Sequence, residues 1–294
     1  MRLNAMAEID KDQSELQRLS AGLDALESKS TQSDSFARKV FNFSGPLIAL
    51  ALFIGIWQIF FYLKLVKEYI LPSPHQVYQA LVNQYQEGIL LTAAWNSLSR
   101  GVQGFFFSII IAIPIGLALG LSKTVRVVLK PITTGLQQLP SVAWVPAAII
   151  WFGLSNATIY AVILLGAVPS IANGLSSGIE QIPSQYLKVG RVLGTTRIQQ
   201  IRHIVLPASF PGFLAGLEQG WAFAWRSLMA AELIAVSPAL GVGLGQLLDV
   251  GRQLGDMSLV LGAILSIMFV GILVEKLAFA PIRERTLRIR GLRN

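Results

Sequence analysis

Several residue types and patterns are missing from this sequence of 294 residues. Cysteine is absent, which excludes disulfide bonds and thiolate metal sites. Asp, Glu, Lys and Arg make up 14% of the chain, whereas soluble domains contain about 25%. The two histidines, His75 and His203, are far apart in the sequence and indicate a surface role rather than a metal site or proton relay. No Gly-Lys dipeptide occurs, so the chain lacks the phosphate-binding loop by which many ATPases hold ATP.

The shortage of charge is concentrated in four runs that contain no Asp, Glu, Lys or Arg. They are Val40–Leu63 with 24 residues, Gly101–Ser122 with 22, Pro131–Ile179 with 49 and Met257–Val274 with 18. A membrane-crossing helix needs about 20 predominantly apolar residues, so the longest run fits two crossings. One such run fits the buried core of a soluble protein, but four do not. The sequence therefore predicts an all-α integral membrane protein.

The runs and their flanking residues predict about six transmembrane helices in one polytopic bundle. The expected crossings are Pro46–Leu63, Ser97–Leu121, Ile132–Phe152, Ala157–Ser177, Pro211–Val236 and Met257–Ala280. Pro140 and Pro146 flank Trp144 in the third crossing and are expected to kink it. The membrane domain accordingly covers residues 46–280.

Polar tails are expected at both ends of this domain. Residues 1–45 contain seven acidic and six basic side chains and do not resemble a signal peptide, which would turn apolar soon after a basic start. Leucines at positions 16, 19, 23 and 26 have helical spacing and predict a short surface helix, followed by a linker at 28–35. Residues 281–294 form a basic tail, expected to lie against anionic lipid headgroups rather than nucleic acid.

The distribution of Lys and Arg orients the predicted helices. With the N-terminus inside, the inner segments contain nineteen of these residues and the outer loops only Lys64, Lys67 and Arg252. Cytoplasmic loops carry the excess of Lys and Arg in membrane proteins. Both termini are therefore predicted to be cytoplasmic.

The segment 183–207 between the fourth and fifth crossings is basic and amphipathic. Pro183 and Ser184 predict a helix start, Gly194 a tight turn, and Thr195 or Thr196 the cap of a second short helix. Apolar residues 198, 201, 204 and 205 are expected to form one stripe of this helix, and Pro207 is expected to end it. By its pattern alone, the segment also fits an amphipathic helix resting on the bilayer.

The order and spacing of several motifs resemble the membrane subunits, or permeases, of ABC importers. The resemblance covers about 45–293 and is closest to the permeases of sulfonate, taurine and nitrate importers, a subgroup that includes bicarbonate and thiamine-precursor importers. The motifs are Leu71–Pro74, Ser97–Val102, Leu139–Pro146 with Trp151–Gly153, Leu193-Gly194 with Leu206-Pro207, and Ala230–Glu232 with Gly241–Gly243.

This resemblance implies a type I importer permease in the bacterial inner membrane, without enzyme activity of its own. Two ABC ATPase subunits, which bind ATP and Mg, are expected on the cytoplasmic side, with a second permease copy in a homodimer and a solute-binding protein outside. An aliphatic sulfonate or taurine is the favoured substrate; nitrate, bicarbonate and a thiamine precursor remain alternatives. An ion-coupled secondary transporter is a different class that also fits apolar helices with charges inside the membrane.

The resemblance also implies that segment 183–207 is the loop on which the ATPase docks. The residues expected to form this coupling loop are Lys188, Arg191, Leu193, Gly194, Thr195, Thr196, Arg197, Leu206 and Pro207. The family loop usually reads Glu-Ala-Ala or Glu-Ala-Arg before the Leu-Gly step, where this chain has Lys188, Val189 and Gly190. Either the ATPase carries a matching acidic change or this contact differs.

Six polar or aromatic residues are candidates for the transport path. They are Gln137, Gln138, Trp144, Glu218, Arg226 and Glu232, of which the last three are charges within the predicted fifth crossing. A charge near the bilayer centre costs about 2.5–3.5 kcal/mol on insertion scales, so each should face the bundle interior, a neighbour or water. Arg226 is expected either to attract an anionic substrate or, as the preferred alternative, to pair with a group on another helix. Glu232 is expected to be structural or gating.

Overall fold

The computed structural model describes residue 45, residues 48–64 and residues 66–289. It divides into two compact units, Met1–Glu68 and Tyr69–Asn294. In the first unit, the apolar helix Ile48–Tyr62 occupies most of the predicted first crossing. The leucine-containing helix and linker predicted in the N-terminal tail lie outside the described residues.

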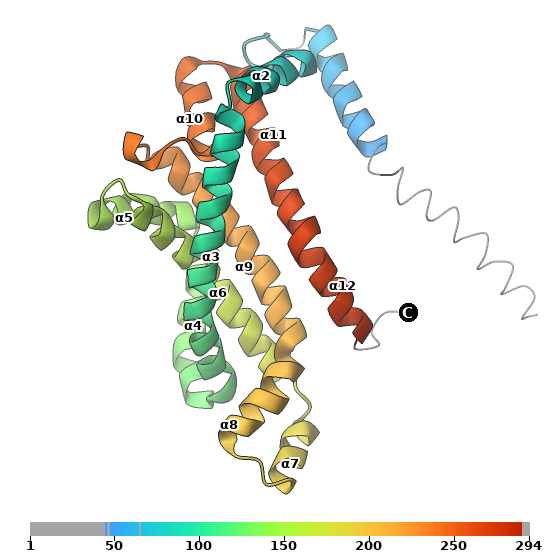
Figure 1. Ribbon diagram of the computed structural model, residues 1–294, viewed down its shortest axis with the longest axis vertical. Helices are drawn as coiled ribbons and strands as arrows, with labels where there is room; N and C mark the ends of the chain where they lie inside the picture. Colours follow the sequence, from blue (N-terminus) through green and yellow to red (C-terminus); the bar gives the residue numbers. More distant parts are fainter. Residues whose placement is uncertain (1–44, 46–47, 65, 290–294) are drawn as a thin grey trace, which may run out of the picture. The chain divides into compact units, whose positions relative to one another are not determined.

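The second unit consists of helices joined by short turns, and its described residues include no strand. Figure 1 shows α2 and α10 at one end of this unit and α7 and α8 at the other. In chain order its elements are α2 Pro74–Gln86, α3 Ile89–Leu121, α4 Lys123–Gln138, η1 Ser141–Trp144, α5 Val145–Phe152, α6 Asn156–Glu180, α7 Ser184–Val192, α8 Arg197–Gln200, η2 Ile201–Val205, α9 Leu206–Ile234, η3 Pro238–Leu240, α10 Leu244–Leu254, α11 Met257–Val274, η4 Glu275–Phe279 and α12 Ala280–Ile289.

Three of the described helices are both long and apolar enough to cross a membrane. They are Ile89–Leu121, Asn156–Glu180 and Met257–Ile289, which contain the predicted second, fourth and sixth crossings. The fifth crossing corresponds to α9, which has 29 residues but is less uniformly apolar because it contains Glu218, Arg226 and Glu232. The expected helical membrane bundle is confirmed.

The third predicted crossing is not one kinked helix. Helix α4 begins nine residues earlier than expected, at Lys123, and ends at Gln138. The chain then passes Pro140 in an extended conformation, forms the single turn η1 and enters the short helix α5. The prediction of a kink was wrong because Pro140 has no amide hydrogen and disfavours helix in the residue before it, Leu139. The helix therefore breaks there.

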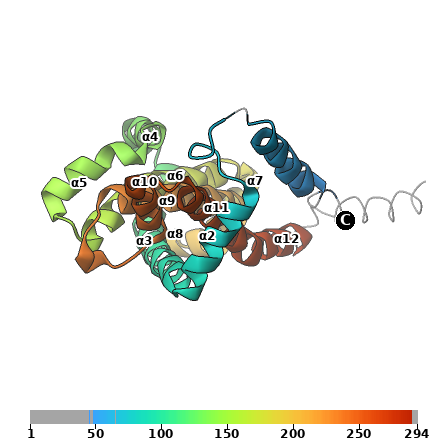
Figure 2. The ribbon, with the colours of Figure 1, turned by 90° about the horizontal axis from the view of Figure 1, so that it is seen from above.

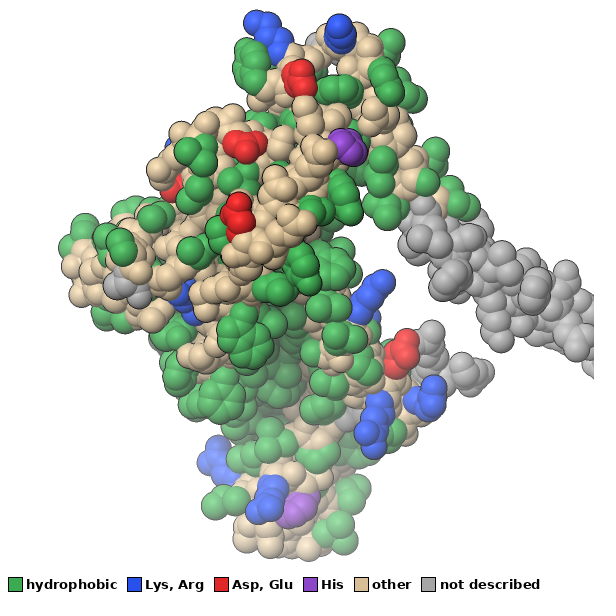
Figure 3. Space-filling view, turned by 45° about the horizontal axis from the view of Figure 1, so that its top comes forward, with side chains coloured by type: hydrophobic (Ala, Val, Ile, Leu, Met, Phe, Trp, Pro, Cys, Tyr) green, Lys and Arg blue, Asp and Glu red, His purple; other side chains and the backbone are tan. Residues whose placement is uncertain are grey.

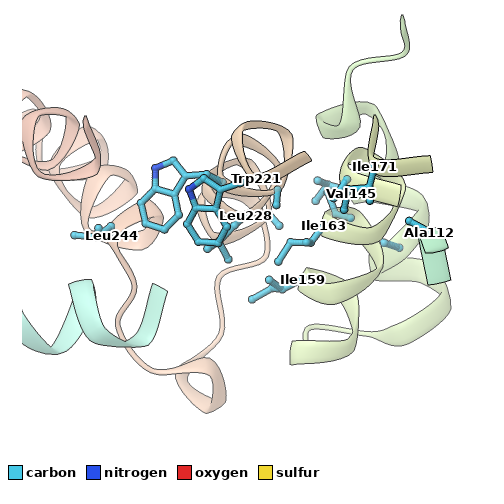
Figure 4. Packing of buried hydrophobic residues seen from close by; sticks show 14 of the residues in the cluster. Ala112, Val145, Ile159, Ile163, Ile171, Trp221, Leu228 and Leu244 are labelled. Atoms are coloured by element: carbon cyan, nitrogen blue, oxygen red, sulfur yellow. The ribbon is translucent and has the colours of Figure 1, made fainter. Parts of the chain in front are cut away.

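The core of the second unit lies between α3, α6 and α9. Ile159, Ile163 and Ile171 of α6 pack toward Trp221 and Leu228 of α9, as Figure 4 shows. Viewed along the bundle, α4 and α5 lie to one side of these three helices and α11 with α12 to another (Figure 2). Helices in a bilayer associate through close packing, because lipid is as apolar as a leucine side chain.

Glycines bring α6 and α9 into backbone contact. A Cβ atom added at Gly174 would lie 2.4 Å from the Cα of Gly216, and one added at Gly212 would lie 2.5 Å from the Cα of Gly178. These distances leave no room for a side chain. The two helices therefore cross with their main chains touching, which makes them one packed pair.

The last crossing continues further than predicted. After α11, the five-residue π-helical turn η4 leads directly into α12, which runs to Ile289. Residues 281–289 of the predicted basic tail are therefore helical. Arg283 in α12 forms ion pairs with Glu218 at 3.1 Å and Glu275 at 3.2 Å. This arrangement ties α12 to α9.

Candidate functional site

The segment 183–207 folds into two short helices that meet at a bend, here called the elbow. Helix α7 begins at Ser184 after Pro183, as predicted. Gly194 has φ +69°, a left-handed conformation that favours glycine, and it forms the predicted turn. The Thr196 side chain accepts from the backbone amide of Gln199, and the Gln199 side chain accepts from that of Thr196. Thr196 is therefore the cap of α8, through a capping box.

The end of the elbow differs from the prediction. Pro207 does not stop a helix; it lies in the first turn of α9, which continues directly from α8 through the π-helical turn η2. Proline is tolerated there because the wider π-helical turn accommodates a residue without an amide hydrogen. Helix α8, the turn η2 and the fifth crossing are therefore one continuous helical element.

Three internal contacts hold α7 against the bend, α8 and η2. Gln200 Nε2 donates to the carbonyl of Leu187 at 2.9 Å, and Thr195 Oγ1 donates to the carbonyl of Gly190 at 2.7 Å. A Cβ added at Gly190 would lie 2.5 Å from Ile204, so α7 touches the turn η2 at this glycine. The elbow is therefore a bend fixed by its own packing.

The outer surface of the elbow is both basic and apolar. Lys188, Arg191 and Arg197 are exposed, and so is His203, as predicted. Ile198 was expected in the apolar stripe with Ile201, Ile204 and Val205, but it is 78% exposed. Figure 3 shows basic and hydrophobic side chains next to one another at the lower end of the molecule. The buried side of the elbow faces the bundle, and the mixed side is free.

An ionic cluster joins the segments predicted to be cytoplasmic. Glu180 at the end of α6 lies 3.2 Å from Arg126 and 3.1 Å from Lys130, both of α4. Arg126 also donates to the carbonyls of Leu119 and Gly120, at 2.9 and 2.6 Å. These carbonyls are unsatisfied at the end of α3, where a cation is favoured. The cluster fixes α3, α4 and α6 at the same end as the elbow.

At the other end of α9, Glu232 is almost completely buried, with 1% of its surface exposed. It accepts a hydrogen bond from Ser97 Oγ at 2.7 Å and from Arg100 Nη1 at 2.9 Å, both of α3. The backbone amide of Gly245 donates to it at 3.1 Å. The buried carboxylate is therefore compensated by one positive charge and two further donors.

The same α3 residues hold the turn between α9 and α10. Arg100 also donates to the carbonyl of Leu240, the Asn96 side chain donates to the carbonyl of Val242 at 2.9 Å, and the amide of Leu244 donates to Ser97 Oγ at 2.8 Å. Gly243 is pressed against Glu232, since an added Cβ would meet its carboxylate at 2.5 Å. We call this network the clasp: Asn96, Ser97, Arg100 and Glu232 with the backbone of 240–245.

The other two charges of α9 are not part of the clasp. Glu218 pairs with Arg283 of α12. Arg226 is exposed; its Nε donates to the carbonyl of Ala222 in its own helix at 3.1 Å, and its guanidinium lies 5.1 Å from the centre of the Phe223 ring. The preferred expectation, a partner on another helix of this chain, was wrong among the described residues. A salt bridge between Arg226 and Glu218 is also absent there.

The polar candidates of the third crossing lie apart from these charges. Gln137 accepts from Asn173 Nδ2 at 3.0 Å, and Asn173 accepts from Thr133 at 2.8 Å, which makes a polar contact between α4 and α6. Gln138 ends α4 and is exposed, and Trp144 ends η1 and is half-buried. The structure therefore brings Gln137 together with α6 but does not join these residues to Glu232.

Two important residues were not singled out from the sequence. Arg100 stands directly before the charge-free run Gly101–Ser122, inside the predicted second crossing, and such a charge requires a partner. The position of Arg100 within an apolar crossing was therefore the sequence feature from which the clasp could have been predicted. Asn173, in contrast, is one polar residue among many in a long apolar run, and only the packing of α6 on α4 shows what it contacts.

Comparison with known proteins gives a match over the bundle. A family model described as "Binding-protein-dependent transport system inner membrane component" matches residues 104–280. The chain is 32% identical over 197 residues to the taurine transport system permease protein TauC of Escherichia coli, covering 65% of this chain and 72% of that protein. It is 29% identical over 250 residues to the putative aliphatic sulfonates transport permease protein SsuC of Bacillus subtilis, covering 85% and 88%.

A further relative and a solved structure extend this comparison. The bicarbonate transport system permease protein CmpB of Synechococcus elongatus is 29% identical over 242 residues, covering 79% of this chain and 85% of that protein. The fold is similar to a chain of the inward-facing MetNI methionine ABC transporter, with a TM-score of 0.57, 20% identity and coverage of 69% and 98%. This structural similarity concerns the fold alone.

Proposed function

Because this chain belongs to the family of binding-protein-dependent transport system inner membrane components, we propose that it forms the path for a small organic sulfonate. The chain is the multi-pass permease subunit of an ABC importer in the inner membrane, a class that works with an ATPase and a solute-binding protein. Taurine or an aliphatic sulfonate is the proposed substrate, because relatives named for these substrates align over 65% and 85% of the chain.

The proposed mechanism uses a second copy of this chain and two ATPase subunits, which bind ATP and Mg. The observation that carries it is the continuous helical path from α8 through η2 and α9 to the clasp. At about 1.5 Å per residue, the 29 residues of α9 span about 44 Å. A displacement of the elbow by the ATPase is transmitted along this helix to Glu232, which holds the turn at 240–245.

The coupling role is tested by changing Gly194. Gly194→Asp places a side chain in a left-handed backbone position at the free end of the elbow. The variant is expected to reach the membrane but to lose its ATPase in co-purification, and to lose uptake of labelled taurine. Retention of the ATPase at the wild-type level would contradict the docking role of the elbow.

The source of energy distinguishes the importer from a secondary transporter. In proteoliposomes containing the whole complex, uptake is expected to require ATP on the side of the membrane that carries the ATPase subunits. Uptake should continue when a protonophore removes the proton gradient. Uptake by the permease without any ATPase, abolished by the protonophore, would instead support an ion-coupled carrier.

Bicarbonate is the second candidate substrate, since a bicarbonate permease aligns over 79% of the chain. Taurine, an alkanesulfonate, nitrate, bicarbonate and a thiamine precursor should be compared as competitors of uptake by the complex with its binding protein. Competition by sulfonates alone supports the proposal, whereas competition by bicarbonate alone replaces it.

A further inference from the structure

The charge of the elbow has one sign only. Between residues 183 and 207 the sequence contains Lys188, Arg191, Arg197 and Arg202 and no Asp or Glu. All four side chains are exposed. Within the part of the chain that the structure describes, no carboxylate forms an ion pair with them. The elbow therefore presents four uncompensated positive charges to whatever lies beneath it.

Apolar side chains are interleaved with these charges. Val189, Val192, Leu193 and Ile198 are 55%, 87%, 74% and 78% exposed. Arg191 and Val192 are neighbours at the end of α7, and Arg197 and Ile198 are neighbours at the start of α8, so the exposed surface of each short helix contains both kinds of side chain. A protein surface with both apolar and charged parts fits this combination.

Two of the cations converge on one small cavity. Arg191 from the end of α7 and Arg197 from the start of α8 both line a cavity of about 140 Å³, together with Gln200 and apolar side chains. Planar guanidinium groups pair with carboxylates through two parallel hydrogen bonds. The cavity therefore suits one carboxylate that reaches between the two arginines.

From these observations we propose that the ATPase surface receiving the elbow is an apolar groove with carboxylates at its rim. One of these carboxylates enters between Arg191 and Arg197, and another faces Lys188. This inference rests on the proposed docking role of the elbow and adds the charge of the partner. It assigns the acidic member of the contact to the ATPase, because the elbow itself contains no Asp or Glu.

The test measures co-purification of the full complex at increasing NaCl concentrations. Lys188→Glu and Arg197→Glu are each expected to weaken retention of the ATPase by about tenfold, since reversing one charge of a close pair turns attraction into repulsion. Lys188→Gln should have a smaller effect than Lys188→Glu. Wild-type retention should fall with salt, and this dependence should be weaker in Lys188→Gln.

Lys123→Glu is the matched control. Lys123 is also exposed and lies on the predicted cytoplasmic side, at the start of α4, but it is outside the elbow. Its reversal should leave retention and salt dependence unchanged. Loss of the ATPase in this variant would mean that the general charge of the inner surface, rather than the elbow, determines binding, and would overturn the proposal.

Restoration of binding by a second charge reversal identifies the partner side chain. Asp and Glu residues of the ATPase are changed singly to Lys, and one of these changes should restore binding of Lys188→Glu but weaken binding of the wild-type permease. If Lys188→Glu and Arg197→Glu bind normally while Gly194→Asp does not, docking at the elbow stands and the acidic groove is wrong. If the reversals matter only in nanodiscs that contain anionic lipid, the cations bind lipid, and the proposal is also wrong.

Discussion

Arg100 and Glu232 are 132 residues apart in the sequence, and Arg100 Nη1 donates to Glu232 Oε1 at 2.9 Å. Their side chains are 10% and 1% exposed. The pair also forms hydrogen bonds to the backbone of the turn that follows α9. Arg100 donates to the carbonyl of Leu240, and Glu232 accepts from the amide of Gly245. Removing either residue therefore leaves a buried charge and at least one backbone group without a partner.

Glu232→Ala is expected to destabilise the folded permease by about 3–5 kcal/mol, the usual cost of removing one member of a buried ion pair. Thermal unfolding in detergent measures this effect. Glu218→Gln is the control, because its ion pair with Arg283 is partly exposed and should contribute about 0–1 kcal/mol. Equal unfolding temperatures for the two variants would show that the clasp does not stabilise the fold.

Gly174→Ala tests the backbone contact between α6 and α9. The new methyl group would lie 2.4 Å from the Cα of Gly216, so the helices must separate, at a cost of about 1–3 kcal/mol or more. Gly135→Ala is matched to it, because Gly135 is also helical and an added Cβ there has no neighbour within 4 Å. Gly174→Ala should unfold at a lower temperature than the wild type, and Gly135→Ala should unfold at the same temperature as the wild type. A stable Gly174→Ala protein would contradict the close crossing.

Gly194→Ala separates backbone strain from coupling. Gly194 has φ +69° and open space around it, so alanine should cost about 1–2 kcal/mol through its backbone alone. Gly88 has φ +74° and equally open space, but it lies beside α2 at the other end of the bundle. Gly194→Ala and Gly88→Ala are expected to have similar thermal stability, whereas only the first should reduce ATP-dependent uptake. A comparable loss of uptake in both would assign the defect to stability.

Arg226→Gln tests whether the exposed guanidinium of α9 serves an anionic substrate. The variant should raise the KM for taurine by about tenfold, since a charge-assisted hydrogen bond contributes more than 1 kcal/mol. Arg226→Lys should retain part of this affinity. The rate at saturating taurine and the thermal stability should change little. An unchanged KM in Arg226→Gln would remove Arg226 from the path.

The sequence by itself determined the membrane class and most of the crossings, because apolar length acts locally along the chain. The sidedness that Lys and Arg indicate stays a prediction. The sequence also determined the turn at Gly194 and the cap at Thr196, which depend on the conformational preferences of single residues. These features require no knowledge of what packs against them.

Only the tertiary structure decided which charges meet. Arg100 finds Glu232 because α3 and α9 pack side by side, and Arg226 remains exposed because its side of α9 faces away from that contact. The passage of a helix through Pro207 and the helical conformation of residues 280–289 depend on how neighbouring segments support the backbone. Hydrophobic length predicts that a helix crosses the membrane, but the burial of each polar group depends on neighbours that are distant in the sequence.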